Sequence, residues 1–166
     1  MYINKKGQFV MTLERLQSIQ STLNQHFFDR ETEIEALLIA LLARQHVLFI
    51  GPAGTGKSAL SSMLGKMIDG SQFFQHLLTP FSTPEEVFGV LSLKDLEQGV
   101  YKRNIENMLP TAHFAFIDEI FKANSAILNS LLTLINERCF YNNGIPIESP
   151  LLTLVGSSNE YIEPDE

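Results

Sequence analysis

Residues 51–58, GPAGTGKS, have the types and spacing of a loop that holds phosphate groups. The three glycines allow the backbone to turn so that successive N–H groups converge on phosphate oxygens. Lys57 would reach the β- and γ-phosphates of a nucleotide, and the hydroxyl of Ser58 would bind Mg²⁺. The alternative is a glycine-rich turn that matches G-x-x-x-x-G-K-[ST] by chance, and the strand and helix expected on either side argue against it.

Two acidic residues and one amide end other apolar stretches. Asp118 and Glu119 end FAFIDE (114–119), and Asn159 ends LLTLVGSSN (151–159). Asp118 could hold the water shell of Mg²⁺, Glu119 could polarise a water aimed at the γ-phosphate, and Asn159 could hold that water without adding negative charge. Taken separately, they could also be solvated acids at a strand end and an asparagine in a turn.

These residues follow short apolar runs that predict buried parallel strands. The runs are HVLFI (46–50), HFAFID (113–118) and LLTLVGSSN (151–159), and QFFQHLL (72–78) could be a further strand. Helical periodicity is expected at residues 12–27, 30–44, 57–67 and 124–138. Strands that alternate with helices predict an α/β fold over residues 1–166, a mostly parallel sheet with helices on both faces. Such sheets bind ligands at the carboxyl ends of their strands.

Three segments between these strands and helices have sequence patterns that predict local structure. Residues 79–86 hold two prolines followed by acids and predict a helix start. Residues 90–104 alternate loosely around a glycine and predict a hairpin. Residues 139–147, CFYNNGIPI, contain Asn-Gly between short strands and predict a second hairpin.

Composition argues against several classes of protein. The 166 residues are 45% hydrophobic and carry a net charge of −7 without a lysine or arginine run, so we expect no binding to nucleic acid. The first ten residues lack a signal segment, and the longest apolar stretch (34–43) is too short to span a membrane. The four histidines and the single cysteine lack metal-binding spacing. We therefore expect a cytoplasmic protein without a transmembrane segment.

Together, the motifs resemble those of the MoxR group of AAA+ ATPases. PFSTPEEVFG, FIDEIFKANSAILNSLLTLINERCFYNNG and SSNE are most similar to its RavA subfamily, and the resemblance covers residues 12–166. It implies a P-loop NTPase fold in which residues 51–58 form the Walker A loop. Asp118 and Glu119 would be the Walker B pair, and Asn159 would be the sensor-1 residue. Residues 90–104 would be the hairpin that MoxR-type proteins insert near helix 2.

The resemblance also implies ATP and Mg²⁺ as cofactors. Lys57, Glu119 and Asn159 would act in catalysis, and Ser58 with Asp118 would hold the metal. The residues expected to contact the nucleotide are Gly51, Pro52, Ala53, Gly54, Thr55, Gly56, Lys57, Ser58 and Ala59.

Members of this group are similar to one another in forming hexameric rings that bind ATP or ADP between neighbouring subunits. An arginine finger from the next subunit completes each site, and RavA-like proteins act with a von Willebrand factor A domain partner in chaperone-like remodelling. This sequence ends at EYIEPDE, before the arginine finger and the helical lid. We therefore expect a truncated ATPase core without its last strand and lid, which binds nucleotide weakly and hydrolyses little.

Two other functions stay open. The chain could be a nucleotide-binding switch or interaction module with little hydrolysis. A small-molecule kinase is disfavoured by Glu119, because a kinase must shield the γ-phosphate from water. Arg138, outside the motifs, is interpreted as a surface arginine at a helix end, with contact to a neighbouring subunit as the alternative. The resemblance also implies that adenine lies against FFDRETEI (27–34), so Ile34 or its neighbours could contact it, with ordinary helix packing as the alternative.

Overall fold

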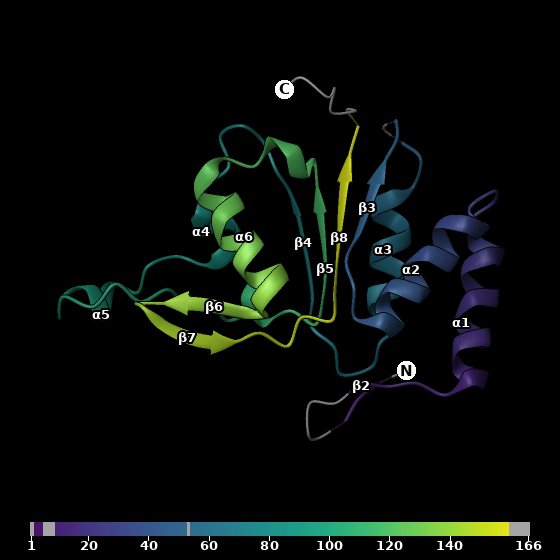
Figure 1. Cartoon of the computed structure of the whole chain (residues 1–166), viewed down its shortest axis with the longest axis horizontal. Helices are drawn as coiled ribbons and strands as arrows, with labels where there is room; N and C mark the ends of the chain where they lie inside the picture. Colours follow the sequence, from purple (N-terminus) through teal and green to yellow (C-terminus); the bar gives the residue numbers. More distant parts are fainter. Residues whose placement is uncertain (1, 5–8, 53, 160–166) are drawn as a thin grey trace.

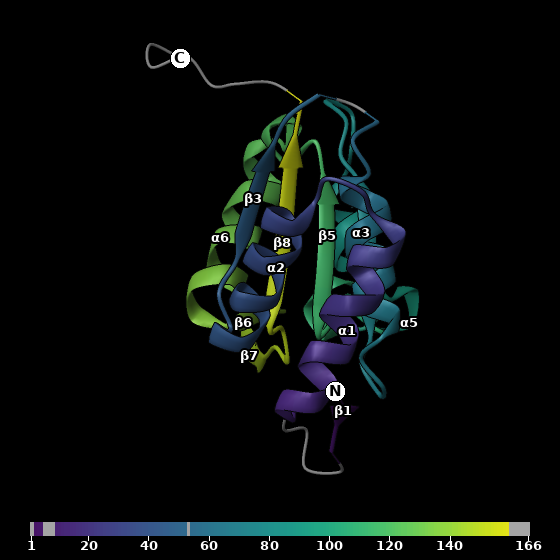
Figure 2. The same ribbon diagram turned by 90° about the vertical axis from the view of Figure 1, so that its right-hand side faces the viewer.

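A four-stranded parallel sheet lies at the centre of the molecule, with helices on both faces (Figures 1 and 2). The structure is a computed structural model that describes residues 2–4, 9–52 and 54–159. The strands follow the order β3-β8-β5-β4. Their bounds are β3 Val47–Ile50, β8 Thr153–Ser158, β5 Phe114–Asp118 and β4 Phe73–Leu77. The predicted α/β class is confirmed, and the four apolar runs contain the four strands. The expectation that the first run is buried is wrong, because β3 lies at an edge of the sheet and exposes Leu48 and Ile50.

The parallel register brings the carboxyl ends of the strands to one edge of the sheet. Ile50, which ends β3, pairs with Ser158 of β8, and Leu77 of β4 pairs with Asp118 of β5. β5 and β8 pair directly in the middle of the sheet. The segments that follow β3, β5 and β8 therefore meet at this edge, although they are far apart in the sequence.

Three helices cover the first face of the sheet: α1 (Leu13–His26), α2 (Glu31–Ala43) and α3 (Lys57–Lys66). Their apolar residues pack against Phe114 and Phe116 of β5 in one buried cluster. α2 lies across much of this cluster, and five of its residues are buried: Ile34, Leu37, Leu38, Ala40 and Leu41. Among the described residues, no helix is both long and apolar enough to cross a membrane.

The second face is covered by α6 (Ser125–Glu137) and α4 (Pro84–Phe88), as Figure 2 shows for α6. Ala115 and Ile117 of β5 point into this second cluster, so alternate residues of β5 serve opposite faces. The 3-10 helices η1 (Leu109–Thr111) and η2 (Ile120–Lys122) flank β5. A strand buried on both faces must be apolar throughout, which explains the FAFI run.

Local capping sets the starts of these helices. Asn124 accepts a hydrogen bond from the Ile127 N–H at 3.0 Å and so caps α6. Thr12 caps α1 in the same way through the Arg15 N–H at 3.3 Å. The helix start predicted within residues 79–86 is α4, which has Pro84 in its first turn.

Two short strands at the N-terminus have no counterpart in the sequence-based expectations. β1 (Tyr2–Ile3) and β2 (Phe9–Val10) pair antiparallel. The Ile3 N–H donates to the Asp69 carbonyl at 2.9 Å, which ties β1 to the end of the α3 segment. Two-residue strands are too short to show alternation, so no periodic signal could reveal them.

The hairpin predicted for residues 90–104 is correct only in that its two arms meet antiparallel, because neither arm forms a strand. This stretch, called the insertion below, contains the short helix α5 (Leu93–Leu96), and its arms share one isolated antiparallel bridge. The hydroxyl of Ser92 accepts a hydrogen bond from the Asp95 N–H at 3.3 Å. Such a cap favours a helical turn over an extended strand, which explains the difference.

The second predicted hairpin is confirmed. β6 (Cys139–Asn142) and β7 (Ile145–Glu148) flank the Asn-Gly turn, and they extend with α5 away from the sheet (Figure 1). The buried Asn142 holds the insertion, because its amide accepts from the Arg103 N–H at 2.7 Å and donates to the Arg103 carbonyl at 3.0 Å. The insertion and the hairpin therefore form one hydrogen-bonded unit.

Folding should weaken as the pH falls, because His46 is bound in its neutral form. Its Nδ1 accepts from the Leu154 N–H at 2.9 Å, and burial together with Arg138 lowers the pKa of His46 to about 4. Burial also lowers the pKa of His113. Between about pH 7 and 5 the unfolded chain therefore binds more protons than the folded one, so the free energy of unfolding decreases as pH falls. Urea unfolding of the wild type across this range checks the direction.

The variant for this measurement is His46→Asn. Its amide oxygen can accept from the Leu154 N–H but does not titrate, so the fall in stability should be shallower than in the wild type. Parallel losses of stability in the two proteins would contradict a role for His46.

Candidate active site

The glycine-rich loop that follows β3 has the backbone conformation that its glycines permit. Gly54 and Gly56 adopt φ angles of 78° and 81°, which side chains larger than glycine rarely adopt. Gly56 precedes α3 directly, so the loop leads into the N-terminus of a ten-residue helix. The N–H groups and partial positive charge of a helix N-terminus favour an anion there.

Lys57 lies against the loop at the start of α3. Its Nζ donates to the carbonyl oxygens of Gly51 at 2.7 Å and Pro52 at 2.9 Å, and it lies 3.5 Å from the Thr55 hydroxyl. The ammonium group is thus held on the loop by neutral acceptors. Phosphate oxygens are stronger acceptors for an ammonium than carbonyls are, so this group suits an anionic ligand.

A cavity of about 330 Å³ lies beside the loop. Besides the loop itself, the residues that line it are Arg30, Glu33, Phe49, Ile50 and Leu60. Ile34 is fully buried in the α1–α2–α3 cluster, so the packing alternative is correct for it, whereas Arg30 and Glu33 beside it line the cavity. The volume is within the range of small-molecule sites.

Arg30 connects the start of α2 to the loop. Its Nε donates to the Thr55 carbonyl at 3.1 Å, and its Nη1 lies 3.8 Å from Glu33. Arg30 lies within residues 27–34, where contact with adenine was expected, but its contact to Thr55 spans 25 positions along the chain and could not be predicted. In the sequence, the feature that marks Arg30 is its position immediately before α2.

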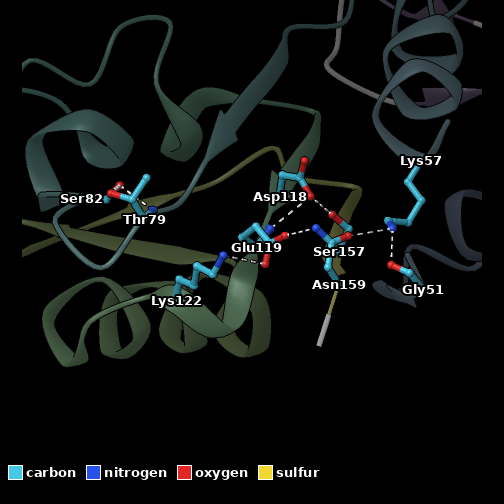
Figure 3. A network of polar contacts seen from close by, with 9 residues as sticks. All are labelled: Gly51, Lys57, Thr79, Ser82, Asp118, Glu119, Lys122, Ser157 and Asn159. Carbon is cyan, nitrogen blue, oxygen red and sulfur yellow. Dashed lines mark hydrogen bonds and ion pairs between the residues drawn. The ribbon is translucent and has the colours of Figure 1, made fainter. Parts of the chain in front are cut away.

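Asp118 ends β5 beside β8. Its Oδ1 accepts the Ser157 hydroxyl and the Glu119 N–H, the latter at 3.1 Å (Figure 3). Its other oxygen has no partner among the residues that the structure describes, so it can accept from a metal-bound water. Ser157 was not singled out from the sequence.

Glu119 has a left-handed backbone with φ 54° and is only 6% exposed. Its Oε1 accepts from the amide of Asn159, and its Oε2 lies 3.3 Å from the Nζ of Lys122. A nearly buried carboxylate is costly unless it is paired, and these two partners meet that need. Lys122, three residues after Glu119, was also missed in the sequence.

Asn159 connects the loop to the acidic pair. Its Oδ1 accepts from Lys57 Nζ at 3.3 Å while its Nδ2 donates to Glu119, so three strand ends share one chain of polar contacts (Figure 3). Ser58 and Ala59 lie in the first turn of α3 and follow Lys57 directly in the sequence. Ala53 lies outside the described residues.

Comparison with known proteins decides the family. A family model described as the MoxR domain of MoxR-vWA-beta-propeller ternary systems matches residues 14–166. The chain belongs to the MoxR group of AAA+ ATPases. The resemblance seen in the sequence is confirmed at this level.

Relatives of this MoxR-group chain differ in how much is known of them. Two uncharacterized proteins of Methanocaldococcus jannaschii are each 44% identical, over 93% and 91% of this chain. The chaperone MoxR1 of Mycobacterium tuberculosis is 28% identical over 73% of it. The chain spans 40% of the length of both archaeal relatives and 32% of MoxR1.

A solved structure supports the same fold for the MoxR-group chain. A protein of Cytophaga hutchinsonii described as a candidate ATPase superposes with a TM-score of 0.68 at 18% identity. The match covers 92% of this chain and 44% of that one. Because only 18% of the residues are identical, this similarity supports the fold alone.

The donor groups at this edge of the sheet suit a magnesium nucleotide better than a bare metal. In the described part of the chain, no cluster of three His, Cys, Asp or Glu residues could hold a metal ion alone. Mg²⁺ commonly takes one or two protein oxygens and fills its remaining positions with phosphate oxygens and waters. The Ser58 hydroxyl and the Asp118 carboxylate are oxygen donors of this kind.

Proposed function

We propose that this chain binds ATP with Mg²⁺ at residues 51–59 and belongs to a machine that hydrolyses the nucleotide. The observation that carries the proposal is the chain of contacts from Lys57 through Asn159 to Glu119, beside Asp118. It combines a cation for phosphate, a base for water and a metal-binding carboxylate at one edge of the sheet. A site that only bound nucleotide would not need the base.

The proposed roles follow from the chemistry of each side chain. Lys57 binds the β- and γ-phosphates once it turns from the loop carbonyls. Glu119 accepts a proton from the attacking water, and Asn159 orients that water through its amide. Ser58 and Asp118 would hold Mg²⁺, which would supply positive charge to the phosphate oxygens when bound. Gly51, with the rest of the loop, supplies N–H groups to those oxygens.

Assembly and biological role are also proposals, since the chain spans less than half of its relatives. We infer a RavA-like cytoplasmic ATPase that works as a hexameric ring, in which the neighbouring subunit contributes an arginine finger. The matching family is described from MoxR-vWA systems, which supports a von Willebrand factor A domain partner. The work done would be chaperone-like remodelling of a partner protein. Residues 1–166 would form the larger part of the ATPase core.

Substitution of Lys57 by alanine should abolish stabilisation of the fold by ATP. A ligand present at about 100 times its Kd stabilises the native state by about 2.7 kcal/mol, so a bound nucleotide should raise the melting temperature clearly. Lys57→Ala removes the cation that contacts the phosphates and should remove this rise. Thermal melting with and without Mg²⁺-ATP measures it.

The matched control is Lys66→Ala, which removes an exposed lysine from the other end of the same helix. This variant should keep the full ATP-dependent rise. Equal rises in the Lys57 variant and the wild type would place nucleotide binding elsewhere.

One observation favours the alternative of a nucleotide switch with little turnover. Both carboxylate oxygens of Glu119 are engaged, one by Asn159 and the other by Lys122. A base held in this way must be released before it can accept a proton from water. ATP binding without hydrolysis by the full-length protein, alone and with its partner, would support the switch.

A further inference from the structure

A second polar cavity lies at the opposite edge of the sheet, next to the ends of α2 and α6 and to the starts of β3 and β8. Its volume is about 550 Å³, and it is called the basal cleft here. The lining residues used below are Arg44, His46, Ile135, Arg138 and Glu148. The candidate active site lies at the carboxyl ends of the strands, so the two sites are separated by the length of the sheet.

Of the two terminal nitrogens of Arg138, which lines this cleft, one has a hydrogen-bond partner among the described residues and the other has none. Arg138 follows α6 with a left-handed backbone, and its Nη2 donates to the Arg44 carbonyl at 2.5 Å. Its Nη1 is buried and has no hydrogen-bond partner among the described residues. An unpartnered buried donor destabilises the fold, and more so when it is charged. The predicted place of Arg138 at a helix end is correct, since it caps α6, but its side chain is only partly exposed.

Glu148 and the C-terminal ends of α2 and α6 bring negative charge to the cleft, while Arg44 adds a second positive charge beside Arg138. Arg44 approaches it closely enough that burial and the charge of Arg44 together lower the pKa of Arg138. Within the described residues, no carboxylate oxygen lies within 4.0 Å of either guanidinium, because the ion pairs present join other residues. His46 adds no charge near neutral pH, because its pKa is lowered to about 4. A helix C-terminus favours a cation, but it does not explain a buried donor without an acceptor.

We propose that the basal cleft binds a small molecule through its phosphate or carboxylate group, with the guanidinium groups of Arg44 and Arg138 as the donors. The Nη1 of Arg138 is buried in this structure, so the side chain must turn toward the cleft before this atom can donate to the ligand. Guanidinium groups bind such oxyanions with paired, charge-assisted hydrogen bonds. The cleft exceeds the size of a single phosphate, so the anionic group belongs to a larger ligand. Glu148 lines the same cleft and opposes an anion, which limits the affinity.

Arginine side-chain NMR tests this proposal directly, because it reads Arg138 itself. Inorganic phosphate and acetate are titrated separately into the 166-residue chain, and the Arg138 guanidinium resonances should shift and saturate with at least one of them. Phosphate also suits the glycine-rich loop, so the titration is repeated in Lys57→Ala, where the Arg138 shift should persist. The anion that saturates at lower concentration identifies a phosphate or a carboxylate as the bound group.

Three variants complete the experiment. Arg138→Lys keeps the charge but loses the paired donors, and should weaken binding about tenfold, as judged from the remaining shifts of Arg44. Arg44→Gln changes an exposed side chain and should also weaken binding, whereas Glu148→Gln should strengthen it. Arg15→Gln, on the exposed surface of α1, is the control and should leave binding unchanged. Unsaturated shifts with both anions, in the wild type and in Glu148→Gln, would overturn the proposal.

Discussion

Replacement of Glu119 by glutamine is expected to lower ATP hydrolysis by the full-length protein about 10²–10⁴-fold and to leave ATP binding intact. The amide has the shape of the carboxylate, and its oxygen can still accept from Asn159. It cannot take a proton from water, and it loses the ion pair with Lys122. Steady-state phosphate release gives the rate, and nucleotide titration gives the affinity.

The control for this variant is Glu106→Gln, which changes an exposed glutamate away from the site. It should leave both the rate and the affinity unchanged. A Glu119→Gln protein that hydrolyses ATP at the wild-type rate would exclude Glu119 as the base. A fall in affinity that matches the fall in rate would indicate that Glu119 serves binding rather than chemistry.

The motif-bearing part of the site could be predicted because its geometry follows from local rules. Asp118 ends one apolar run and Lys57 follows the loop after another, and the ends of parallel strands meet at one edge of the sheet. The side chains that hold these residues could not be predicted. Ser157 reaches Asp118 across 39 positions of the chain, and a serine inside an apolar strand gives no sign of its partner.

The strand order is a further property that sequence patterns do not contain. Each strand could be identified from its own apolar run, but the placement of β8 between β3 and β5 depends on contacts between residues more than 30 positions apart. The strands predicted for the insertion are not formed, for a different reason. Its alternation around Gly99 favoured two strands, whereas the Ser92 cap favours a helical turn, and a window of 15 residues does not decide between such signals.

The insertion is held at both of its ends by polar contacts. Arg103, on the returning arm, donates to Glu85 at 2.9 Å and to the Gly89 carbonyl at 2.8 Å, and its backbone is held by Asn142. The Asn104 N–H donates to the Val90 carbonyl at 2.8 Å. The two arms therefore meet closely where the insertion leaves α4, and Gly89 lies at this junction.

Substitution of Gly89 by alanine should destabilise the fold by about 2–4 kcal/mol. Gly89 has a φ of 97°, and an added Cβ would lie 1.9 Å from the carbonyl oxygen of Asn104. The clash involves backbone, which cannot turn away as a flexible side chain could. Relief requires the returning arm to move, with loss of the Arg103 contact to the Gly89 carbonyl. Urea unfolding measures the change in the free energy of unfolding.

Gly99→Ala separates the clash from backbone strain. Gly99 also has a positive φ, of 76°, but its added Cβ would meet nothing within 4 Å. This variant should lose only about 1 kcal/mol, the cost of the strained backbone alone. The excess loss in Gly89→Ala then measures how tightly the two arms of the insertion are held together. Equal losses in the two variants would mean that the junction opens freely, and that the insertion moves independently of α4.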